Sequence, residues 1–154
     1  MTVRILFVCL GNICRSPLAE AALRAEAERL GLDVEVDSAG TGDWHVGQPP
    51  DRRAIAAARR NGADIARFRA RLVEARDFDR FDHIVALDRD NLAGLKRIQP
   101  AGSRARLSLL LDHVEGREGE AVADPYYGEE SDFDTAWNDV VDGARALANR
   151  IAAR

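Results

Sequence analysis

Apolar positions in the first part of the chain follow two patterns: short continuous runs, and longer stretches with helical spacing. Residues 3–8 are apolar apart from Arg4, as in a parallel strand buried on both faces. Over residues 17–30, alanine and leucine recur every three or four positions, which predicts a helix, and Gly31 suits the position after its end. A second strand is expected over residues 34–38. The chain therefore begins as strand, helix, strand.

The same alternation continues through the middle of the chain. A helix is expected around residues 51–60, followed by a strand over residues 83–87. A helix over about residues 89–97 and a fourth strand near residues 105–110 come next. Strands that alternate with helices predict an α/β fold with a parallel sheet covered on both faces. We therefore expect a single domain over residues 1–154, with a doubly wound, four-stranded parallel sheet.

The last helix has the clearest pattern. Ser131 with Asp134 forms an acidic variant of the capping box and predicts where this helix begins. One apolar stripe then follows at helical spacing: Phe133, Trp137, Val140, Ala144, Leu147 and Ile151. This stripe predicts a long helix with one buried face.

Two long stretches, residues 40–50 and 112–130, lack a clear helix or strand pattern and contain aromatic residues with glycine or proline. Long loops in a compact domain are often functional. In a doubly wound sheet, ligands bind outside the carboxyl ends of the strands. We therefore expect these two loops to form the walls of a cleft at that edge.

Composition narrows the class of protein. The chain of 154 residues is 46% hydrophobic and 31% charged, with a formal net charge of −4, which is ordinary for a globular protein and argues against a nucleic-acid partner. An arginine-rich stretch is a local exception and is interpreted as solvated surface, with steering of an acidic partner as the alternative; it comprises Arg59, Arg60, Arg67, Arg69 and Arg71. No segment resembles a membrane span or a signal peptide, so we expect a cytoplasmic protein without a membrane partner.

Candidate chemistry lies between the first strand and the first helix, in the sequence CLGNICRS over residues 9–16. Gly11 and Asn12 can adopt the unusual backbone angles of a tight loop, whose N–H groups, with the helix N-terminus, favour an anion. This positive field and the Arg15 guanidinium should favour the thiolate of Cys9, and Arg15 can hold two phosphoryl oxygens. The segment therefore predicts a cysteine-dependent phosphatase. The alternative is that Cys9 and Cys14 are buried apolar residues and Arg15 solvates a helix end.

Three segments together resemble the low-molecular-weight protein tyrosine phosphatases. Residues 8–17 (VCLGNICRSP) resemble the phosphatase loop of that family, residues 38–47 (SAGTGDWHVG) its second loop, and residues 124–128 (DPYYG) its general-acid loop. The likeness covers almost the whole chain. It implies the expected sheet, with the phosphatase loop after the first strand and with the first and third strands flanking the site.

The catalytic residues that follow from these segments are Cys9, Arg15 and Asp124. Cys9 is expected to attack phosphorus and form a phosphocysteine that water hydrolyses, while Arg15 and the loop N–H groups neutralise the transition state. Asp124 is expected to protonate the leaving group. An aspartate before proline has a restricted, extended backbone, and partial burial beside Tyr126 and Tyr127 would help to keep it protonated. The alternative for Asp124-Pro125 is a simple turn.

The substrate-binding residues divide into the loop and the cleft. In the loop we expect Leu10, Gly11, Asn12, Ile13, Cys14 and Ser16 to surround the phosphate. In the cleft we expect Trp44, Tyr126 and Tyr127, with Leu10, since aromatic residues at such positions of the family sandwich the phenyl ring of phosphotyrosine. A deep apolar slot favours a long aryl phosphate over phosphoserine. The alternative for Trp44 is a place in the core.

Supporting roles are expected for polar residues around the loop. Ser16 is expected to cap the first helix, to donate to the Cys9 sulfur, or to do both. Asn12 and Ser38 resemble the pair that shapes the loop in the family, although a local backbone contact is the alternative for Ser38. Asp88 is expected to hold Ser16 or another loop residue, and no histidine lies in a catalytic pattern. The family often has Ser-His where this chain has Ala66-Arg67, so the support of the loop differs here.

We therefore expect a protein tyrosine phosphatase that needs no metal or cofactor, since no His or Cys cluster has metal-ligand spacing. Its expected partners are phosphotyrosine proteins, with phosphate or vanadate as inhibitors. An arsenate reductase on the same loop would need further cysteines, and Cys9 and Cys14 are the two in the chain. A phosphocysteine carrier would need the intermediate to survive, against an Asp124 placed to activate water. A non-catalytic binding module would need only the loop.

Overall fold

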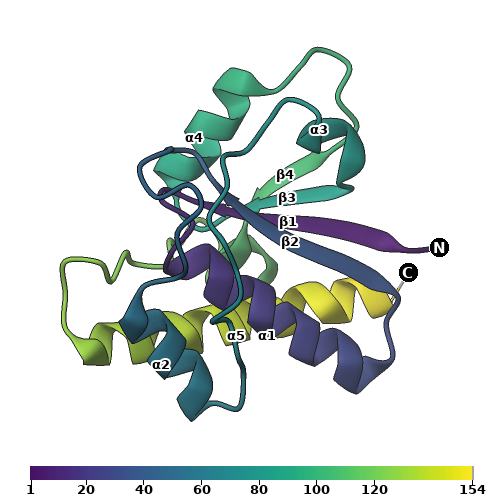
Figure 1. Ribbon diagram of the computed structural model, residues 1–154. Coiled ribbons are helices and arrows are strands. Elements are labelled where there is room, and N and C mark those ends of the chain that lie inside the picture. The colour runs from purple at the N-terminus through teal and green to yellow at the C-terminus, as the bar shows by residue number, and fades with distance from the viewer. Residues whose placement is uncertain (154) are drawn as a thin grey trace.

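The computed structural model describes residues 1–153 and has a four-stranded, fully parallel sheet at its centre (Figure 1). The strand order is β2-β1-β3-β4. The strands are β1 (Val3–Cys9), β2 (Val34–Gly40), β3 (His83–Ala86) and β4 (Arg106–Leu109). Strands β1 and β3 are neighbours, and the chain leaves β1 in opposite directions to reach β2 and β3. The carboxyl ends of β1 and β3 therefore form the switch point of the sheet.

Helices cover both faces of the sheet, which confirms the doubly wound fold. On one face lie α1 (Arg15–Leu30) and α5 (Glu130–Ala152), with α2 (Arg52–Arg60) beside them (Figure 1). On the other face lie α3 (Asp77–Arg80) and α4 (Arg89–Ile98). A short 3₁₀ helix, η1 (Leu110–His113), follows β4. The four-residue α3 and η1 were not predicted, because segments this short carry no measurable periodicity.

Strand β1 explains why its sequence is a continuous apolar run. Ile5 and Phe7 are fully buried in the core between the sheet and α1 and α5. Leu6 and Val8 point to the opposite face and are fully buried in the core beneath α3 and α4. Because both faces are covered, every position from 5 to 8 must be apolar.

The last helix confirms the predicted stripe, whose six residues are all buried. Its start was predicted wrongly, since the helix begins at Glu130 rather than after Ser131. The capping box uses Glu129 and Asp132 instead, with Asp132 Oδ2 accepting from the Glu129 N–H at 2.8 Å. The carboxylate that reaches back three residues therefore belongs to Asp132 and not to Asp134.

Three further boundaries lie outside their predicted ranges. Strands β1 and β2 continue to Cys9 and Gly40, because their ladder extends to that pair. Helix α1 begins at Arg15 and ends where predicted, with Gly31 in a left-handed conformation at φ 66°. Among residues 1–153, no helix combines the length and the apolar character that crossing a bilayer requires.

His113 in η1 is expected to make stability depend on pH. Burial lowers the pKa of His113 from 6.5 to about 4, and the charge of Arg150 acts in the same direction. Nε2 contacts Ser108 Oγ at 2.9 Å, and Nδ1 has no partner within residues 1–153, so a second ring proton has no acceptor there. Between pH 4 and 6.5 the unfolded chain binds this proton and the folded chain does not. Stability is therefore complete above pH 6.5 and is lost as pH falls towards 4.

Since the His113 ring is only partly buried, solvent screening reduces this loss to about 1–2 kcal/mol. Urea unfolding at several pH values should give a steeper loss for the wild type than for His113→Gln, which cannot titrate. Parallel stability curves for the two proteins over this range would contradict the assignment.

Candidate active site

The predicted loop lies at the switch point of the sheet, between the last residue of β1, Cys9, and the first residue of α1, Arg15. Asn12 adopts a left-handed conformation with φ 57°, as predicted. Gly11 was expected to be a glycine because the loop needs an unusual backbone angle there. That reason was wrong, because the φ of Gly11 is not positive. A Cβ atom at Gly11 would lie 3.0 Å from His45 Cδ2, so the residue is small because a neighbouring loop approaches it.

The loop presents unpaired N–H groups. Within residues 1–153, the backbone N–H groups of residues 11–14 donate no hydrogen bond to the protein. The Ile13 carbonyl points away and accepts from the Asp51 N–H at 2.8 Å. A row of free N–H groups at the start of a helix is a binding site for a phosphate-sized anion.

Arg15 is held rigidly beside this loop. Its side chain is almost fully buried, and Nη1 donates to Asp88 Oδ2 at 2.7 Å and to the Val122 carbonyl at 3.0 Å. These two anchors turn the other edge of the guanidinium towards the pocket. Burial alone would lower the pKa of Arg15, but the Cys9 sulfur and the Asp88 carboxylate raise it above its ordinary value. Arg15 is therefore a fixed positive charge, and Asp88 supports Arg15 rather than Ser16.

The sulfur of Cys9 lies 3.0 Å from Ser16 Oγ. Ser16 lies inside the first turn of α1, and no side chain caps that helix, so the capping interpretation of Ser16 was wrong. The expected role of Ser16 that remains is its contact with the Cys9 sulfur. Burial raises the pKa of the Cys14 thiol, assisted by the negative charge of Asp51. Both cysteines are free thiols, and the surroundings of Cys14 hold it neutral.

The two long loops form the walls of the cleft over Cys9, as predicted. The cleft has a volume of about 310 Å³ and contains most of the expected residues. Its lining comprises Cys9, Leu10, Gly11, Ile13, Cys14, Arg15, Trp44, His45, Asp124, Tyr126 and Tyr127. Trp44 is 68% exposed, which excludes the alternative of a core residue. The Tyr126 and Tyr127 rings meet edge to face at 4.9 Å, and Tyr127 is almost fully exposed.

Asp124 faces the cleft, but its surroundings differ from the expectation. Its side chain is 40% exposed, so it is partly buried, as expected. Tyr127 is almost fully exposed and adds little to this burial, so the expected cover from both tyrosines is absent. Oδ1 accepts from the Tyr126 N–H at 3.1 Å, and Oδ2 lies 3.6 Å from Arg15 Nη2. The carboxylate and the guanidinium therefore face each other across the space above Cys9.

Two residues of the site were missed in the sequence. His45 lines the cleft, and its Nδ1 contacts Gln48 Oε1 at 2.9 Å. Arg53 on α2 donates to the Tyr126 carbonyl at 2.9 Å and to the Gly128 carbonyl at 3.1 Å. Arg53 thereby anchors the loop that carries Asp124. His45 could have been predicted, because it follows Trp44 in a loop that was expected to line the cleft. Arg53 could not, because an arginine on a helix is ordinary and indicates no particular contact.

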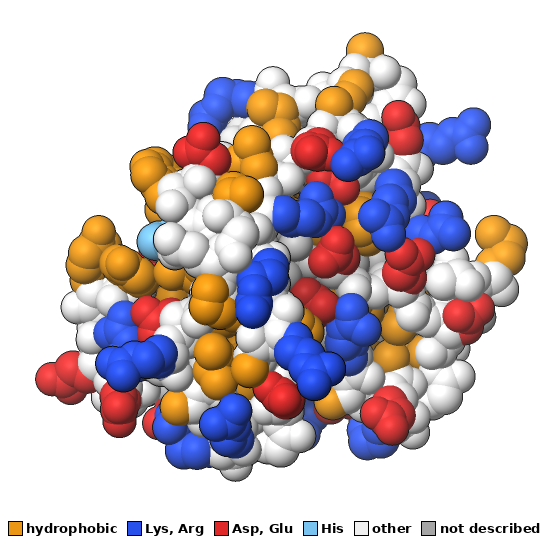
Figure 2. All heavy atoms as spheres, in the orientation of Figure 1, with side chains coloured by type: hydrophobic (Ala, Val, Ile, Leu, Met, Phe, Trp, Pro, Cys, Tyr) orange, Lys and Arg blue, Asp and Glu red, His pale blue; other side chains and the backbone are white. Residues whose placement is uncertain are grey.

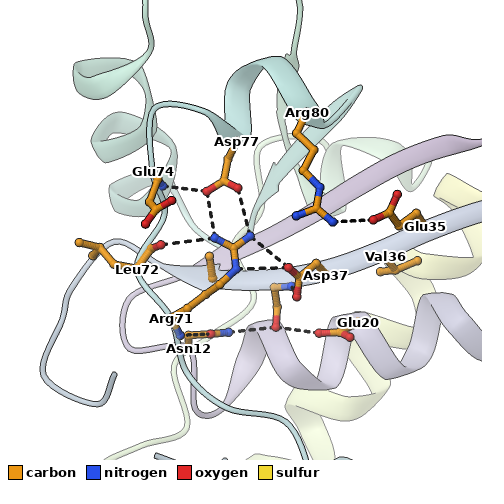
Figure 3. A network of polar contacts seen from close by, with 12 residues as sticks. Asn12, Glu20, Glu35, Val36, Asp37, Arg71, Leu72, Glu74, Asp77 and Arg80 are labelled. Carbon is orange, nitrogen blue, oxygen red and sulfur yellow. Dashed lines mark hydrogen bonds and ion pairs between the residues drawn. The ribbon is translucent and has the colours of Figure 1, made fainter. Parts of the chain in front are cut away.

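The predicted pair of Asn12 and Ser38 is present, with Asn12 Nδ2 donating to Ser38 Oγ at 3.0 Å. Asn12 Oδ1 accepts from the backbone N–H of Arg71 at 3.0 Å, and the Arg71 guanidinium binds Asp37 and Asp77 (Figure 3). Support for the loop therefore comes from Arg71, and not from a histidine near position 67.

The arginine-rich stretch is not uniform solvated surface. Arg71 belongs to the internal network just described, and Arg60 pairs with Asp134 at 2.6 Å. Arg69 donates to the carbonyls of Ala66 and Phe68. On the face of the molecule that Figure 2 shows, basic and acidic side chains are interspersed.

Known proteins resemble this chain over almost its whole length. The family model described as "Low molecular weight phosphotyrosine protein phosphatase" matches residues 4–154. A protein of that name from Schizosaccharomyces pombe is 41% identical over 97% of each chain. The crystal structure of a protein tyrosine phosphatase from Entamoeba histolytica superposes with a TM-score of 0.92 and 33% identity, covering 98% of this chain and 97% of the other. The structure of a Drosophila arginine phosphatase superposes with a TM-score of 0.89 and 31% identity, covering 95% and 96%.

Proposed function

The chain belongs to the low molecular weight phosphotyrosine protein phosphatase family, and from this membership we propose how its residues divide the hydrolysis of tyrosine phosphate. The protein is a protein tyrosine phosphatase. The main support for these roles is that three functional groups meet in one cleft. They are the thiol of Cys9, the fixed guanidinium of Arg15 and the carboxylate of Asp124.

In the first step, the Cys9 thiolate attacks phosphorus in line with the leaving oxygen. The S–P bond forms as the P–O bond to the tyrosine breaks, and Asp124 gives its proton to the departing phenolate. Arg15 and the free N–H groups of residues 11–14 bind the three equatorial oxygens, where charge accumulates. Asp124 must carry its proton at the start of this step.

In the second step, Asp124, now a carboxylate, takes a proton from a water molecule. The oxygen of that water attacks phosphorus, and the S–P bond breaks with its electron pair returning to Cys9. Ser16 Oγ, 3.0 Å from the sulfur, donates to the thiolate as it leaves. The products are inorganic phosphate and the free enzyme. Phosphate and vanadate, which fit the same loop, are expected inhibitors.

The shape of the cleft supports an aryl phosphate as substrate. Leu10, Trp44 and Tyr126 stand above the loop as apolar walls and can enclose a phenyl ring. A phosphoserine is too short to reach these walls while its phosphate sits in the loop. Apolar walls also favour a phenyl ring over the charged guanidinium of phosphoarginine. The substrates we propose are therefore phosphotyrosine segments of proteins, and a cytoplasmic location stays a prediction from the sequence.

Three peptides of one sequence that carry phosphotyrosine, phosphoserine or phosphoarginine test this assignment, with EDTA present. Burial of the ring should give phosphotyrosine a kcat/KM roughly 10- to 100-fold higher than the others. Trp44→Ala should narrow this preference, whereas Val46→Ala, an exposed residue of the same loop outside the cleft lining, should not. Equal rates on all three peptides, or a preference for phosphoarginine, would contradict the proposal.

A further inference from the structure

A second hollow in the surface adjoins the cleft at Leu10. It has a volume of about 320 Å³, close to the volume of about 310 Å³ of the cleft, and Leu10 belongs to the lining of both. The rest of its lining comes from Thr41, in the loop after β2, and from one face of α4. Gly94 on α4 faces Thr41 there, and the two segments lie side by side in Figure 1. The mechanism above gives this hollow no role.

The wall between the cleft and the hollow is fixed to the backbone of the phosphatase loop. The Thr41 N–H donates to the Cys9 carbonyl at 3.0 Å, and the Gly42 N–H donates to the Leu10 carbonyl at 2.9 Å. The hollow therefore has a fixed position relative to the nucleophile. A substrate whose phosphate is held by the loop presents its neighbouring residues to this surface.

Gly94 keeps the hollow open. It lies in the interior of α4, where glycine destabilises a helix relative to alanine. Its backbone does not require glycine, because its φ is not positive. A Cβ atom at Gly94 would lie 3.5 Å from Thr41 Cγ2 and 3.8 Å from Arg97 Nη2, which are ordinary contacts. Neither strain nor crowding demands a glycine here, and its effect is to leave space between Thr41 and Arg97.

The polar side chains of the hollow have hydrogen-bonding groups without a partner. Asn91 is 2% exposed, and its Oδ1 accepts from the Asp88 N–H at 3.2 Å, so the orientation of its amide is fixed. Its Nδ2 makes no hydrogen bond within residues 1–153. Asp90 and Arg97 are exposed members of the lining, and neither forms an ion pair with a described residue. The hollow thus offers two donors, on Asn91 and Arg97, and one acceptor, on Asp90.

A glutamine side chain matches this set. Its carbonyl oxygen can accept from Asn91 and Arg97 while its NH₂ group donates to Asp90, and its CH₂ groups can pack against Leu10 and Ile98. A glutamate would be attracted by Arg97 but repelled by Asp90, and a lysine would meet the reverse. An apolar side chain would leave the buried amide of Asn91 unpaired.

We propose that this hollow is a subsite for a glutamine side chain of the substrate, two positions from the phosphotyrosine. In an extended segment, side chains two positions apart point to the same face and lie about 6.6 Å apart, which suits two adjoining hollows that share Leu10. This subsite rests on the proposed function, since it concerns the protein segment that carries the phosphotyrosine.

Phosphotyrosine peptides of one sequence, with glutamine, alanine, glutamate or lysine at the test position, measure the preference. The test position lies two residues before the phosphotyrosine in one series and two residues after it in the other, because an extended segment can cross the cleft in either direction. In one of the series, kcat/KM should be about three- to tenfold higher with glutamine than with alanine, and lower with glutamate or lysine than with glutamine. Each value is divided by kcat/KM for p-nitrophenyl phosphate, which does not reach the hollow.

Gly94→Leu should fill the hollow and reduce the advantage of glutamine over alanine to about twofold or less. Leucine forms helices better than glycine, so this substitution favours the folding of α4. The matched control is Ala93→Leu, which adds the same side chain at an exposed position of α4 outside the lining. This control should preserve the advantage of glutamine.

Arg97→Gln tests the charges of the subsite. Without the guanidinium, a lysine is no longer repelled and a glutamate is no longer attracted, while Asp90 remains. The lysine peptide should therefore gain about threefold or more relative to the glutamate peptide. Lys96→Gln removes a positive charge from the same helix outside the lining and should leave this ratio nearly unchanged. A purely structural role of Arg97 would not move the ratio.

Equal values with glutamine and alanine in both series would overturn the proposal, as would a preference of the wild type for glutamate or lysine. An advantage of glutamine that survives Gly94→Leu, or that Ala93→Leu removes to the same extent, would also overturn it. Failure of the proposed function would show differently: no phosphotyrosine peptide of either series would be hydrolysed, and the subsite would fall with it.

Discussion

Cys9→Ser is expected to abolish turnover of p-nitrophenyl phosphate while leaving the fold and phosphate binding intact. A serine hydroxyl stays neutral at a pH where a thiol can ionise, so serine is a much weaker nucleophile at this position. The rate should fall on the order of 10⁴-fold or more, as when a nucleophile is removed. Cys9 is almost fully buried and serine is close to it in size, so the loop N–H groups and Arg15 remain in place.

The measurement combines rates in the presence of EDTA with calorimetric titration of vanadate or phosphate. The wild type should turn over rapidly and be inhibited by vanadate, and Cys9→Ser should bind phosphate without hydrolysing the substrate. Cys14→Ser keeps the nucleophile and should retain measurable turnover. Residual activity of Cys9→Ser above about one percent would contradict a phosphocysteine intermediate.

The fold was predictable where the pattern of apolar residues along the chain determines which positions are buried. The run over residues 3–8 is apolar at every position that helices cover, and the α5 stripe contacts the core at every turn. The position of the loop followed from the same logic, because a cysteine at the end of a buried strand must lie at the sheet edge. Gly31 could be placed because a left-handed residue after a helix favours glycine.

What the sequence did not reveal depends on contacts between distant segments. The support of Asn12 by the Arg71 backbone joins residues 59 positions apart, and any residue except proline could donate that N–H group. The exposure of Asp124 depends on where Tyr127 points, and neither residue type determines it. Ser16 was ambiguous for another reason: a serine beside a helix start suits a cap and an internal contact equally well.

The contact between Arg15 and Asp124 affects how the cleft binds an anion. With their charges 3.6 Å apart at the closest atoms, the two side chains attract each other when the cleft holds no anion. A phosphoryl group bound by Arg15 must displace this contact, because 3.6 Å leaves no room for it between the two side chains. We therefore expect Asp124 and the bound anion to compete for Arg15.

Asp124→Ala is expected to reveal two effects of this carboxyl: it donates a proton to the leaving group, and its negative charge opposes the binding of phosphate at Arg15. Without a proton donor, the leaving group must depart as an anion, so phenyl phosphate turnover should fall about 10²- to 10⁴-fold. The fall should be smaller for p-nitrophenyl phosphate, whose phenolate is stable, and kcat should become steeply dependent on leaving-group basicity. Loss of the negative charge opposite Arg15 should also tighten phosphate binding. Asp134→Ala, a half-exposed acid paired with Arg60 on the surface, serves as control and should change neither quantity. If phenyl phosphate and p-nitrophenyl phosphate lose the same small factor in Asp124→Ala, the proton comes from another group and the assignment fails.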